Sequence, residues 1–292
     1  MKVTLIVSTR GRANEVERLL SSVARQTYRG FELRLSDQNE DDRLGPILYR
    51  FQQSFRLERL RTSKGLSRGR NAGLSQPLGD IVAFPDDDCW YPENLLEQVV
   101  DYFHRNLSID AIAAKPCFSG LAPIAGPQEV IRPTAYTRAN IFDVGLGAIS
   151  YCIFLRRRFV EAVGGFDETL GVGAGTPWGS GEESDYLIRG LQQQMRIEHV
   201  PSLSVFHPMK GDSTERMYLY ACGYGRVLAK HRYPKTRVLW DLARPLAMMF
   251  AQPFHSAGRH RRWNFVRGLI SGYLDPTPFL KEPLFLPDRT LV

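Results

Sequence analysis

Cysteine is scarce and scattered in this chain of 292 residues. The cysteines lie at positions 89, 117, 152 and 222, form no CxxC pair and have no His-rich neighbourhood. This spacing argues against a zinc site. Isolated cysteines in a chain of this length also do not build a disulfide framework, so we expect reduced thiols and a cytoplasmic setting.

Long apolar runs are missing as well. No segment approaches the roughly 20 uninterrupted apolar residues that a membrane-spanning helix needs. The N-terminal run MKVTLIVSTRGR is too short for a signal peptide and is followed by no small-residue cleavage site, so we expect a strand there. With 43% hydrophobic and 24% charged residues, the composition is that of an ordinary globular protein.

Acidic residues are nearly absent from one part of the chain. Between Arg226 and Arg267, Asp241 is the single acid among many cationic residues, and the whole chain has a net charge of +7. A basic balance favours anionic partners such as nucleotides, nucleic acid or an acidic membrane surface. No recognisable nucleic-acid module is present, so we do not expect nucleic acid. The mixture of cations with Leu, Met, Phe and Trp predicts either a helix on an anionic membrane surface or helices packed on the rest of the protein.

Strand-like and helix-like segments alternate through the first third. We expect strands over 3–8, 31–37, 57–62 and 79–84, and helices over 13–26, 44–55, 66–76 and 91–106, with Pro92 near the first turn of the last. Such alternation predicts an α/β fold with a mostly parallel sheet covered on both faces. We expect 1–110 and 111–212 to be two halves of one domain, and 213–292 to be a basic, amphipathic helical extension.

The middle of the chain is less regular. Strand-like pieces at 110–118, 148–156 and 196–207 and helix-like pieces at 157–163 and 183–194 surround a glycine-rich tract, GGFDETLGVGAGTPWGSGEESD. Long tracts of this kind in compact domains are often functional loops or lids. Trp178, inside the tract, suits either stacking on a ligand or packing within the lid.

Three adjacent aspartates, Asp86, Asp87 and Asp88, follow the apolar run IVAF. Three carboxylates at close range cannot all stay ionised without a counter-charge, and Mg²⁺ or Mn²⁺ would supply one. Parallel sheets bind ligands beyond the carboxyl ends of their strands, where Asp37 is also expected. The sequence therefore predicts a metal–nucleotide site, with a solvated acidic turn that caps the next helix as the alternative.

Three further groups of residues carry a candidate role. Lys64, Arg68 and Arg70 lie at a loop-to-helix junction that suits a diphosphate, or they form a charged helix face. Glu182, Glu183 and Asp185 supply a candidate general base at the end of the glycine-rich tract, or they cap the next helix. His207 follows an apolar strand and is either a further metal ligand or a structural histidine.

The order of these segments resembles the family 2 glycosyltransferases of the GT-A fold, of the bacterial polysaccharide type. The segments are VSTRGR, FELRLSDQNEDD, GLSRGRNAGL, GDIVAFPDDDCWYPENLLE, the glycine-rich tract and VFHPMKG, which together span about Lys2 to Gly211. The resemblance implies a Rossmann-like GT-A sheet and inverting transfer of a sugar from a nucleoside-diphosphate donor, favouring a UDP-sugar. It also implies a divalent metal, Mn²⁺ or Mg²⁺.

The same resemblance implies roles for individual residues. The nucleotide site would be formed by Thr9, Arg10, Asp37, Lys64, Arg70, Asn71, Asp86 and Asp87. The metal ligands would be Asp88, Asp86 and, as in some relatives, His207. The family often has two acids where this chain has Ser36 and Asp37, a departure at the position that contacts the base.

Catalysis is implied at the second half of the site. The family's base is usually the aspartate of a Glu-Asp pair, and this chain has Glu183 at that position, with Asp185 as a competitor. The donor sugar and acceptor would lie beside Gly165, Phe166, Asp167, Trp178 and Glu182. The expected acceptor is a glycan or a lipid-linked glycan, at the inner face of the cell membrane. A metal-dependent nucleotidyltransferase and a non-catalytic nucleotide-sugar-binding protein are the alternatives.

Overall fold

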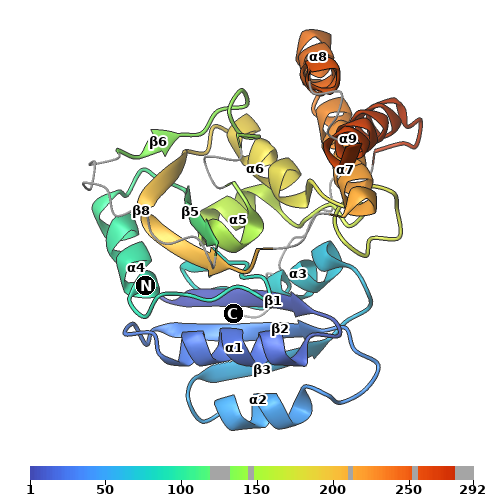
Figure 1. Cartoon of the computed structure of the whole chain (residues 1–292). Helices are drawn as coiled ribbons and strands as arrows, with labels where there is room; N and C mark the ends of the chain where they lie inside the picture. The colour runs from blue at the N-terminus through green and yellow to red at the C-terminus, as the bar shows by residue number, and fades with distance from the viewer. Residues whose placement is uncertain (119–131, 144–147, 210–212, 252–255, 280–292) are drawn as a thin grey trace.

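The structure is a computed structural model that describes residues 1–118, 132–143, 148–209, 213–251 and 256–279. One eight-stranded sheet runs through it in the order β3-β2-β1-β4-β7-β5-β8-β6 (Figure 1). The strands are β1 (Val3–Thr9), β2 (Phe31–Asp37), β3 (Arg56–Arg61), β4 (Ile81–Ala83), β5 (Ala111–Phe118), β6 (Thr134–Ala135), β7 (Ile153–Arg156) and β8 (Ile197–His207). The helices are α1 (Ala13–Ala24), α2 (Gly45–Phe51), α3 (Leu66–Leu74), α4 (Leu95–Arg105), α5 (Arg157–Val163), α6 (Glu182–Gln192), α7 (Thr214–Lys230), α8 (Lys235–Ala251) and α9 (Ser256–Leu274).

The sheet is mostly parallel, as the alternating sequence predicts. Strands β1 to β4 pair in parallel, and β5 pairs in parallel with β8. Strand β7 is antiparallel to both of its neighbours, β4 and β5. Strands β4 and β5 therefore run in the same direction. The segment expected to be one strand over 148–156 begins instead with a 3₁₀ turn at Ser150–Cys152, and only its last four residues form β7.

Both faces of the sheet are covered. In β1, Leu5 and Val7 pack with α1, α2 and α4, whereas Ile6 packs with α3, α5 and α6 on the other face. This separation follows from the period of two in a strand. Helix α4 begins at Leu95 and not at residue 91, so Pro92 lies just before the helix, and its carbonyl accepts the Leu95 N–H.

The order of the strands creates a switch point between β1 and β4. The chain moves outward from β1 through β2 to β3, and then returns to add β4 on the opposite side of β1. Their carboxyl ends therefore leave the sheet next to each other, with Thr9 at one and the loop that holds Asp86 at the other. Open α/β sheets bind ligands at such a point.

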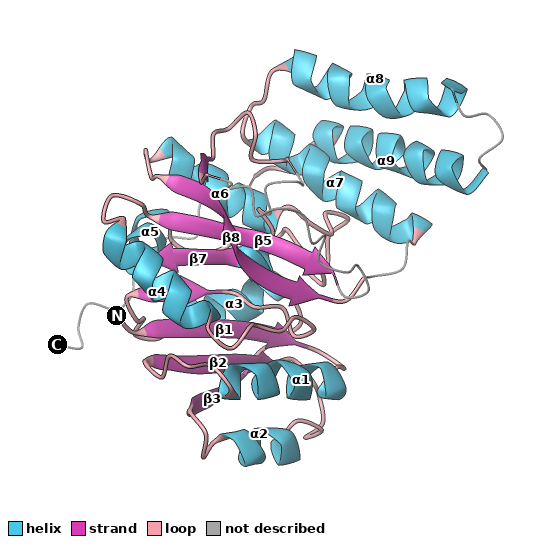
Figure 2. Ribbon diagram, turned by 60° about the vertical axis from the view of Figure 1, so that its left-hand side comes forward, coloured by secondary structure: helices cyan, strands magenta, loops and turns pink. Residues whose placement is uncertain are grey.

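Helices α7, α8 and α9 form a layer beyond α5 and α6 (Figure 2). Helix α7 packs closely along α9, and α8 lies on α9 as the outermost element. Cys222, Leu228 and Leu269 join the same core cluster as Ile6, so these helices continue the core of the sheet domain. The expected helical pattern of this part is confirmed, whereas the Pro-rich end from residue 280 lies outside the described residues.

Candidate functional site

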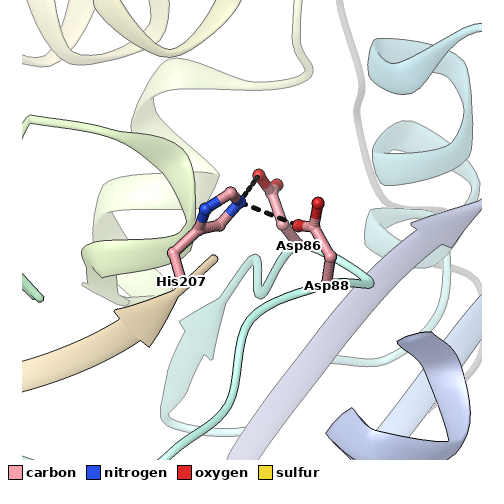
Figure 3. A group of neighbouring side chains, drawn as sticks. All are labelled: Asp86, Asp88 and His207. Carbon is pink, nitrogen blue, oxygen red and sulfur yellow. Dashed lines mark ion pairs between the residues drawn. The ribbon is translucent and has the colours of Figure 1, made fainter. Parts of the chain in front are cut away.

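The acidic loop after β4 meets the carboxyl end of β8 (Figure 3). One ligand atom each from Asp86, Asp88 and His207 lies within 4.8 Å of the others. The Nε2 atom of His207 is 2.8 Å from Asp88 Oδ1 and 4.0 Å from Asp86 Oδ2. The structure thus brings together the three residues that the sequence suggested as metal ligands.

The imidazole of His207 is oriented for ligation through Nε2. Its Nδ1 atom is 2.7 Å from the Pro208 carbonyl oxygen, which can only accept, so Nδ1 donates to that oxygen and Nε2 is the nitrogen that faces the two carboxylates. Tyr151 stacks on the ring at a centroid distance of 4.7 Å. Two carboxylates and one imidazole with a fixed tautomer form a suitable donor set for Mn²⁺, so the residues present fit a divalent metal.

The middle aspartate turns away from this cluster. Asp87 accepts a 2.7 Å hydrogen bond from Thr9 Oγ1, and Arg12 donates to Asp87 and Asp88, each at 2.8 Å. Burial and the charges of Asp88 and Asp86 raise the pKa of Asp87 to about 6, although Arg12 and Thr9 act in the opposite direction. Arg12 therefore balances part of the negative charge of the loop and fixes the second oxygen of Asp88.

Arg70 links the acidic loop to the start of α6. Its guanidinium donates to Glu182 at 3.1 Å and to Asp86 at 3.4 Å. The side chain is buried, and its cationic group lies over the rings of Phe84 and Phe166, at 5.9 and 5.3 Å. Because Arg70 pairs with both carboxylates, it holds the N-terminus of α6 against the candidate metal site.

Two acids on the first turn of α6 have opposite surroundings. Burial raises the pKa of Glu183 well above its ordinary range, and the charge of Glu182 adds to this. For Asp185, burial acts in the same direction, but the His231 hydrogen bond and the charges of Arg189 and Lys230 outweigh it, so its pKa is well below the ordinary value.

Asp185 is fully buried and is contacted by two cations and a histidine. His231 Nε2 and Lys230 Nζ lie 2.8 and 2.7 Å from its Oδ1, and Arg189 lies 3.0 Å from its Oδ2. Lys230 also donates to Asp167 at 2.7 Å. Asp185 thus ties α6 to the end of α7, which favours a positioning role over that of a base.

Asp37 lies at the carboxyl end of β2 among arginines. Arg59 donates to its Oδ2 through two nitrogens at 2.8 and 2.5 Å, and Arg61 lies at 3.2 Å. The Asn39 backbone N–H donates to Oδ1 at 2.9 Å. The carboxylate is buried, which fixes its position at the edge of the sheet beside Thr9.

The segment Gly165–Asp167 is held from three sides. Asn71 accepts from the Phe166 N–H at 2.7 Å and donates to the Phe166 carbonyl at 3.0 Å. Arg189 donates to the Gly165 carbonyl at 2.7 Å, and the Phe166 ring is stacked on Tyr186 in the core. Asn71 and the Phe166 side chain therefore fix the position of this segment.

The remaining expected residues lie on the glycine-rich tract and on exposed loops. Trp178 is buried, and Arg226 lies 4.0 Å from its ring centroid, which supports packing within the tract over stacking on a ligand. Lys64 is exposed and adjoins Gly173 of the tract, and Arg10 is exposed after β1. Neither cation joins the acidic cluster in this conformation.

A sequence profile described as Glycosyl transferase family 2 matches residues 4–164. That is more than half of the chain. The chain belongs to this family. The match spans Thr9, Asp37, the aspartate triplet and α3, and it ends at Gly164, the first residue of the glycine-rich tract.

Curated relatives of this family 2 chain align over part of their length. An uncharacterized glycosyltransferase of Haemophilus influenzae is 27% identical over 65% of this chain and 62% of its own. The poly(ribitol-phosphate) beta-N-acetylglucosaminyltransferase TarP of Staphylococcus aureus is 26% identical over 56% of this chain and 50% of its own. The chain spans less than two thirds of the length of these relatives.

Solved structures share the fold over nearly the whole chain. The mannosyltransferase PcManGT of Pyrobaculum calidifontis, in complex with GDP-Man and Mn²⁺, has a TM-score of 0.65 at 15% identity, with 94% of this chain and 88% of that one covered. TarS 1-349 of S. aureus in complex with UDP-GlcNAc has a TM-score of 0.57 at 17% identity, covering 94% and 90%. Both likenesses concern the fold, which is that of the GT-A glycosyltransferases.

Three residues at the site escaped the sequence analysis. Arg12 lies in the motif STRGR, where Arg10 was expected to contribute, and only the course of the loop decides which arginine turns inward. Lys230 and His231 lie more than 40 residues after Asp185 and were counted among the basic residues of the C-terminal part. Their proximity to the site depends on how α7 packs against α6.

Proposed function

We propose that this chain is an inverting, metal-dependent glycosyltransferase that moves a sugar from a nucleoside-diphosphate donor to a hydroxyl group of a glycan or lipid-linked acceptor. The observation that carries the proposal is the cluster of Asp86, Asp88 and His207, with ligand atoms within 4.8 Å of one another. Through Arg70, this cluster is linked to the Glu182 carboxylate at the start of α6, and Glu183 is the next residue of that helix. Membership of the glycosyltransferase family favours this function over nucleotidyl transfer or simple binding.

The donor would bind at the switch point between β1 and β4. Asp86, Asp88 and His207 would hold a divalent metal, which supplies positive charge against the diphosphate leaving group. Arg70 is fixed beside this position, and Lys64 on its exposed loop would add a second cation. Thr9, Arg10 and Asp37 would contact the nucleoside, and Asp87 the ribose, at the edge where β1 and β2 end.

Glu183 is the proposed general base. Its raised pKa gives the carboxylate more affinity for the proton of an attacking hydroxyl than an ordinary glutamate has. Attack on the anomeric carbon from the face opposite the diphosphate would form the new C–O bond as the old one breaks, with inversion. Asp185 would position α6 through its ion pairs and leave the proton transfer to Glu183.

The comparisons favour a uridine donor. One structural neighbour is in complex with UDP-GlcNAc, and the curated relative WfgD of Escherichia coli is a UDP-Glc-dependent glucosyltransferase that is 29% identical over 36% of this chain. PcManGT in complex with GDP-Man makes guanosine the second candidate. The WfgD acceptor is a diphosphoundecaprenol-linked sugar, which supports a lipid-linked acceptor here. We propose that the enzyme reaches such an acceptor at the inner face of the cell membrane.

Calorimetric titration of nucleoside diphosphates and their sugars, with and without Mn²⁺, tests the donor site. We expect one nucleotide to bind far more tightly with Mn²⁺, and this gain to disappear in Asp88→Ala. The matched control is Asp101→Ala, an exposed carboxylate on α4 whose ion pair with Arg105 lies within that helix. Removing Asp88 takes away a charge-bearing ligand at the metal site, whereas Asp101 lies outside the site.

Two results would count against the proposal. Nucleotide binding that is unaffected by Mn²⁺ would remove the metal from the donor site. If no nucleotide binds, the three aspartates would instead form an acidic turn that caps the next helix. Inversion is tested separately, because the anomeric configuration of the product is read directly by NMR once an acceptor is found.

A further inference from the structure

The outer face of α8 is both exposed and apolar. Its exposed positions recur at helical spacing and hold Thr236, Leu239, Trp240, Ala243, Arg244, Ala247, Met248 and Ala251. Leu239 and Trp240 are 64% and 68% exposed, and Met248 is 40% exposed. Arg244 and, at the start of the helix, Lys235 are exposed cations among or beside these positions. The helix therefore presents a continuous apolar stripe, which we call the α8 face, on the outermost element of the molecule (Figure 2).

Folding of the described chain does not account for the α8 face. The opposite side of the helix supplies Val238 and Leu242 to the core, and Arg237 and Asp241 add polar contacts with Ala139 and Tyr224. Exposed apolar side chains that gather on one face are typical of an interaction surface, whereas single ones are common on any protein. The α8 face thus has the composition of a surface that another partner covers.

Helices α8 and α9 carry exposed cations, namely Lys235, Arg244, Arg259, Arg261 and Arg267. Arg226 and Lys230, by contrast, are engaged with Trp178 and Asp185. From Arg226 to Arg267 the sequence contains ten Lys and Arg residues and one acid, Asp241. That acid is already engaged, because Arg237 and the Tyr224 hydroxyl both donate to its Oδ2, at 2.7 and 2.6 Å. Helix α9 adds the exposed side chains of Trp263, Arg267 and Ile270 next to α8.

The positive charge around the α8 face favours an anionic lipid surface over a second copy of the chain as the partner. A second copy that docked through the same face would bring two strongly basic helices together, and their charges would repel. An anionic lipid surface complements both features, since it accepts apolar and aromatic side chains below the headgroups and attracts Arg and Lys from above. None of the described helices is both long and apolar enough to cross a membrane, so the contact would be with the surface.

We propose that the α8 face, with the exposed residues of α9, docks this protein onto an anionic lipid surface. Leu239, Trp240 and Met248 enter the headgroup region, and Arg244 and Arg267 contact lipid phosphates. The proposal deepens the proposed function, because it would bring the active site to a lipid-linked acceptor. Docking itself requires neither donor nor acceptor, so its failure and the failure of the transferase assignment are separately measurable.

Co-sedimentation with vesicles tests the proposal on the full chain. We expect binding to mixed phosphatidylglycerol–phosphatidylcholine vesicles and little binding to phosphatidylcholine alone. The double variant Leu239→Gln/Trp240→Gln should weaken binding by roughly tenfold or more, since it removes the two large apolar side chains that enter the headgroup region. Arg244→Gln should weaken it by about fivefold at low salt, with a smaller loss at high salt.

The matched control is Tyr49→Gln, which removes an exposed aromatic side chain on α2, at the opposite end of the molecule in Figure 1. It should bind vesicles as the unaltered chain does. An unchanged thermal unfolding midpoint for every variant verifies that the fold is intact. Absence of binding to anionic vesicles, or equal binding by the double variant, would overturn the proposal. So would a dimer of the unaltered chain in analytical ultracentrifugation that becomes a monomer in the double variant, because the α8 face would then be a subunit interface.

Discussion

Two carboxyl groups on the first turn of α6 illustrate how surroundings assign roles to similar residues. Glu183 gains little compensation for its burial and lies beside the negative Glu182, so its pKa rises. Asp185 is fully buried, but it is paired with Arg189 and Lys230 and hydrogen-bonded to His231, so its pKa falls. A proton acceptor needs an elevated affinity for the proton, and a structural anion needs a lowered one.

The first consequence concerns removal of the proposed base. Glu183→Gln keeps the shape of the side chain but removes its basicity, so we expect kcat to fall by about 10²- to 10⁴-fold while the donor still binds. Steady-state kinetics together with donor titration measure the two effects. Glu161→Gln, at an exposed carboxylate on α5, is the control. Retention of more than half of kcat by Glu183→Gln would show that another group takes the proton.

The pH profile provides an independent check of the same assignment. A base acts in its deprotonated form, so activity should appear as the pH rises through the elevated pKa of Glu183. The acidic limb of kcat/KM should therefore lie above the ordinary range of a glutamate, near 4.3. An acidic limb of kcat/KM at or below that ordinary value would show that Glu183 is not the general base.

Residue types and strand ends allowed part of the site to be predicted. Asp86, Asp88 and His207 follow apolar strands, and parallel strands bring their carboxyl ends to one edge. Arg12 was not predictable, because the direction of a loop side chain depends on backbone angles that the sequence pattern does not specify. Likewise, the partnership of Asp185 with His231 joins two elements whose packing is not visible in either helix alone.

At the scale of elements, the contact between α7 and α9 depends on small residues. A Cβ atom on Gly272 would lie 1.9 Å from the backbone oxygen of Cys222, and one on Gly268 would lie 2.4 Å from that of Tyr218. Backbone atoms cannot move aside as a flexible side chain does. The glycines therefore set the distance between the two helices.

This geometry reverses the usual effect of a helical glycine. On propensity alone, Gly272→Ala would stabilise α9 by about 1 kcal/mol. Overpacking against the Cys222 backbone should instead destabilise the protein by roughly 1–3 kcal/mol, so packing outweighs propensity. Urea unfolding measures the difference, with Leu274→Ala, at an exposed position of α9, as the control within about 0.5 kcal/mol. A more stable Gly272→Ala variant would contradict the close packing.

Most elements follow from sequence periodicity, and the exceptions have physical reasons. The 3.6-residue pattern of α1 reflects one buried helix face, and the nearly continuous apolar run of β1 reflects a strand that is buried on both faces. The local sequence pattern predicts neither the short strand β6 nor the antiparallel direction of β7. Both depend on pairing with distant strands, β8 and β4, within the assembled sheet. The apolar face of α8 was visible only as composition until the packing showed which side is buried.

Across the whole molecule, the C-terminal helices continue the core on one face of the sheet. Val227, Leu228 and Val238 join the same cluster as the buried residues of α5 and α6. Arg226 lies over Trp178 of the glycine-rich tract, and Lys230 joins Asp167 to Asp185. The region from 213 onward thus supports the arrangement around the proposed base as well as carrying the α8 face.

A truncated chain of residues 1–212 should therefore not retain a stable fold. It would expose the apolar surface that α7 and α9 cover, and it would leave Asp185 buried with Arg189 as its single remaining cation from the described network. Loss of partners from a buried ion pair costs about 3–5 kcal/mol, which is a large part of a typical total stability of about 5–15 kcal/mol. Thermal unfolding and nucleotide titration of the two chains measure the effect. A truncated chain that unfolds at the full-length Tm and binds nucleotide equally well would show that residues 1–212 form an autonomous domain, and the buried network would then have no part in holding α6.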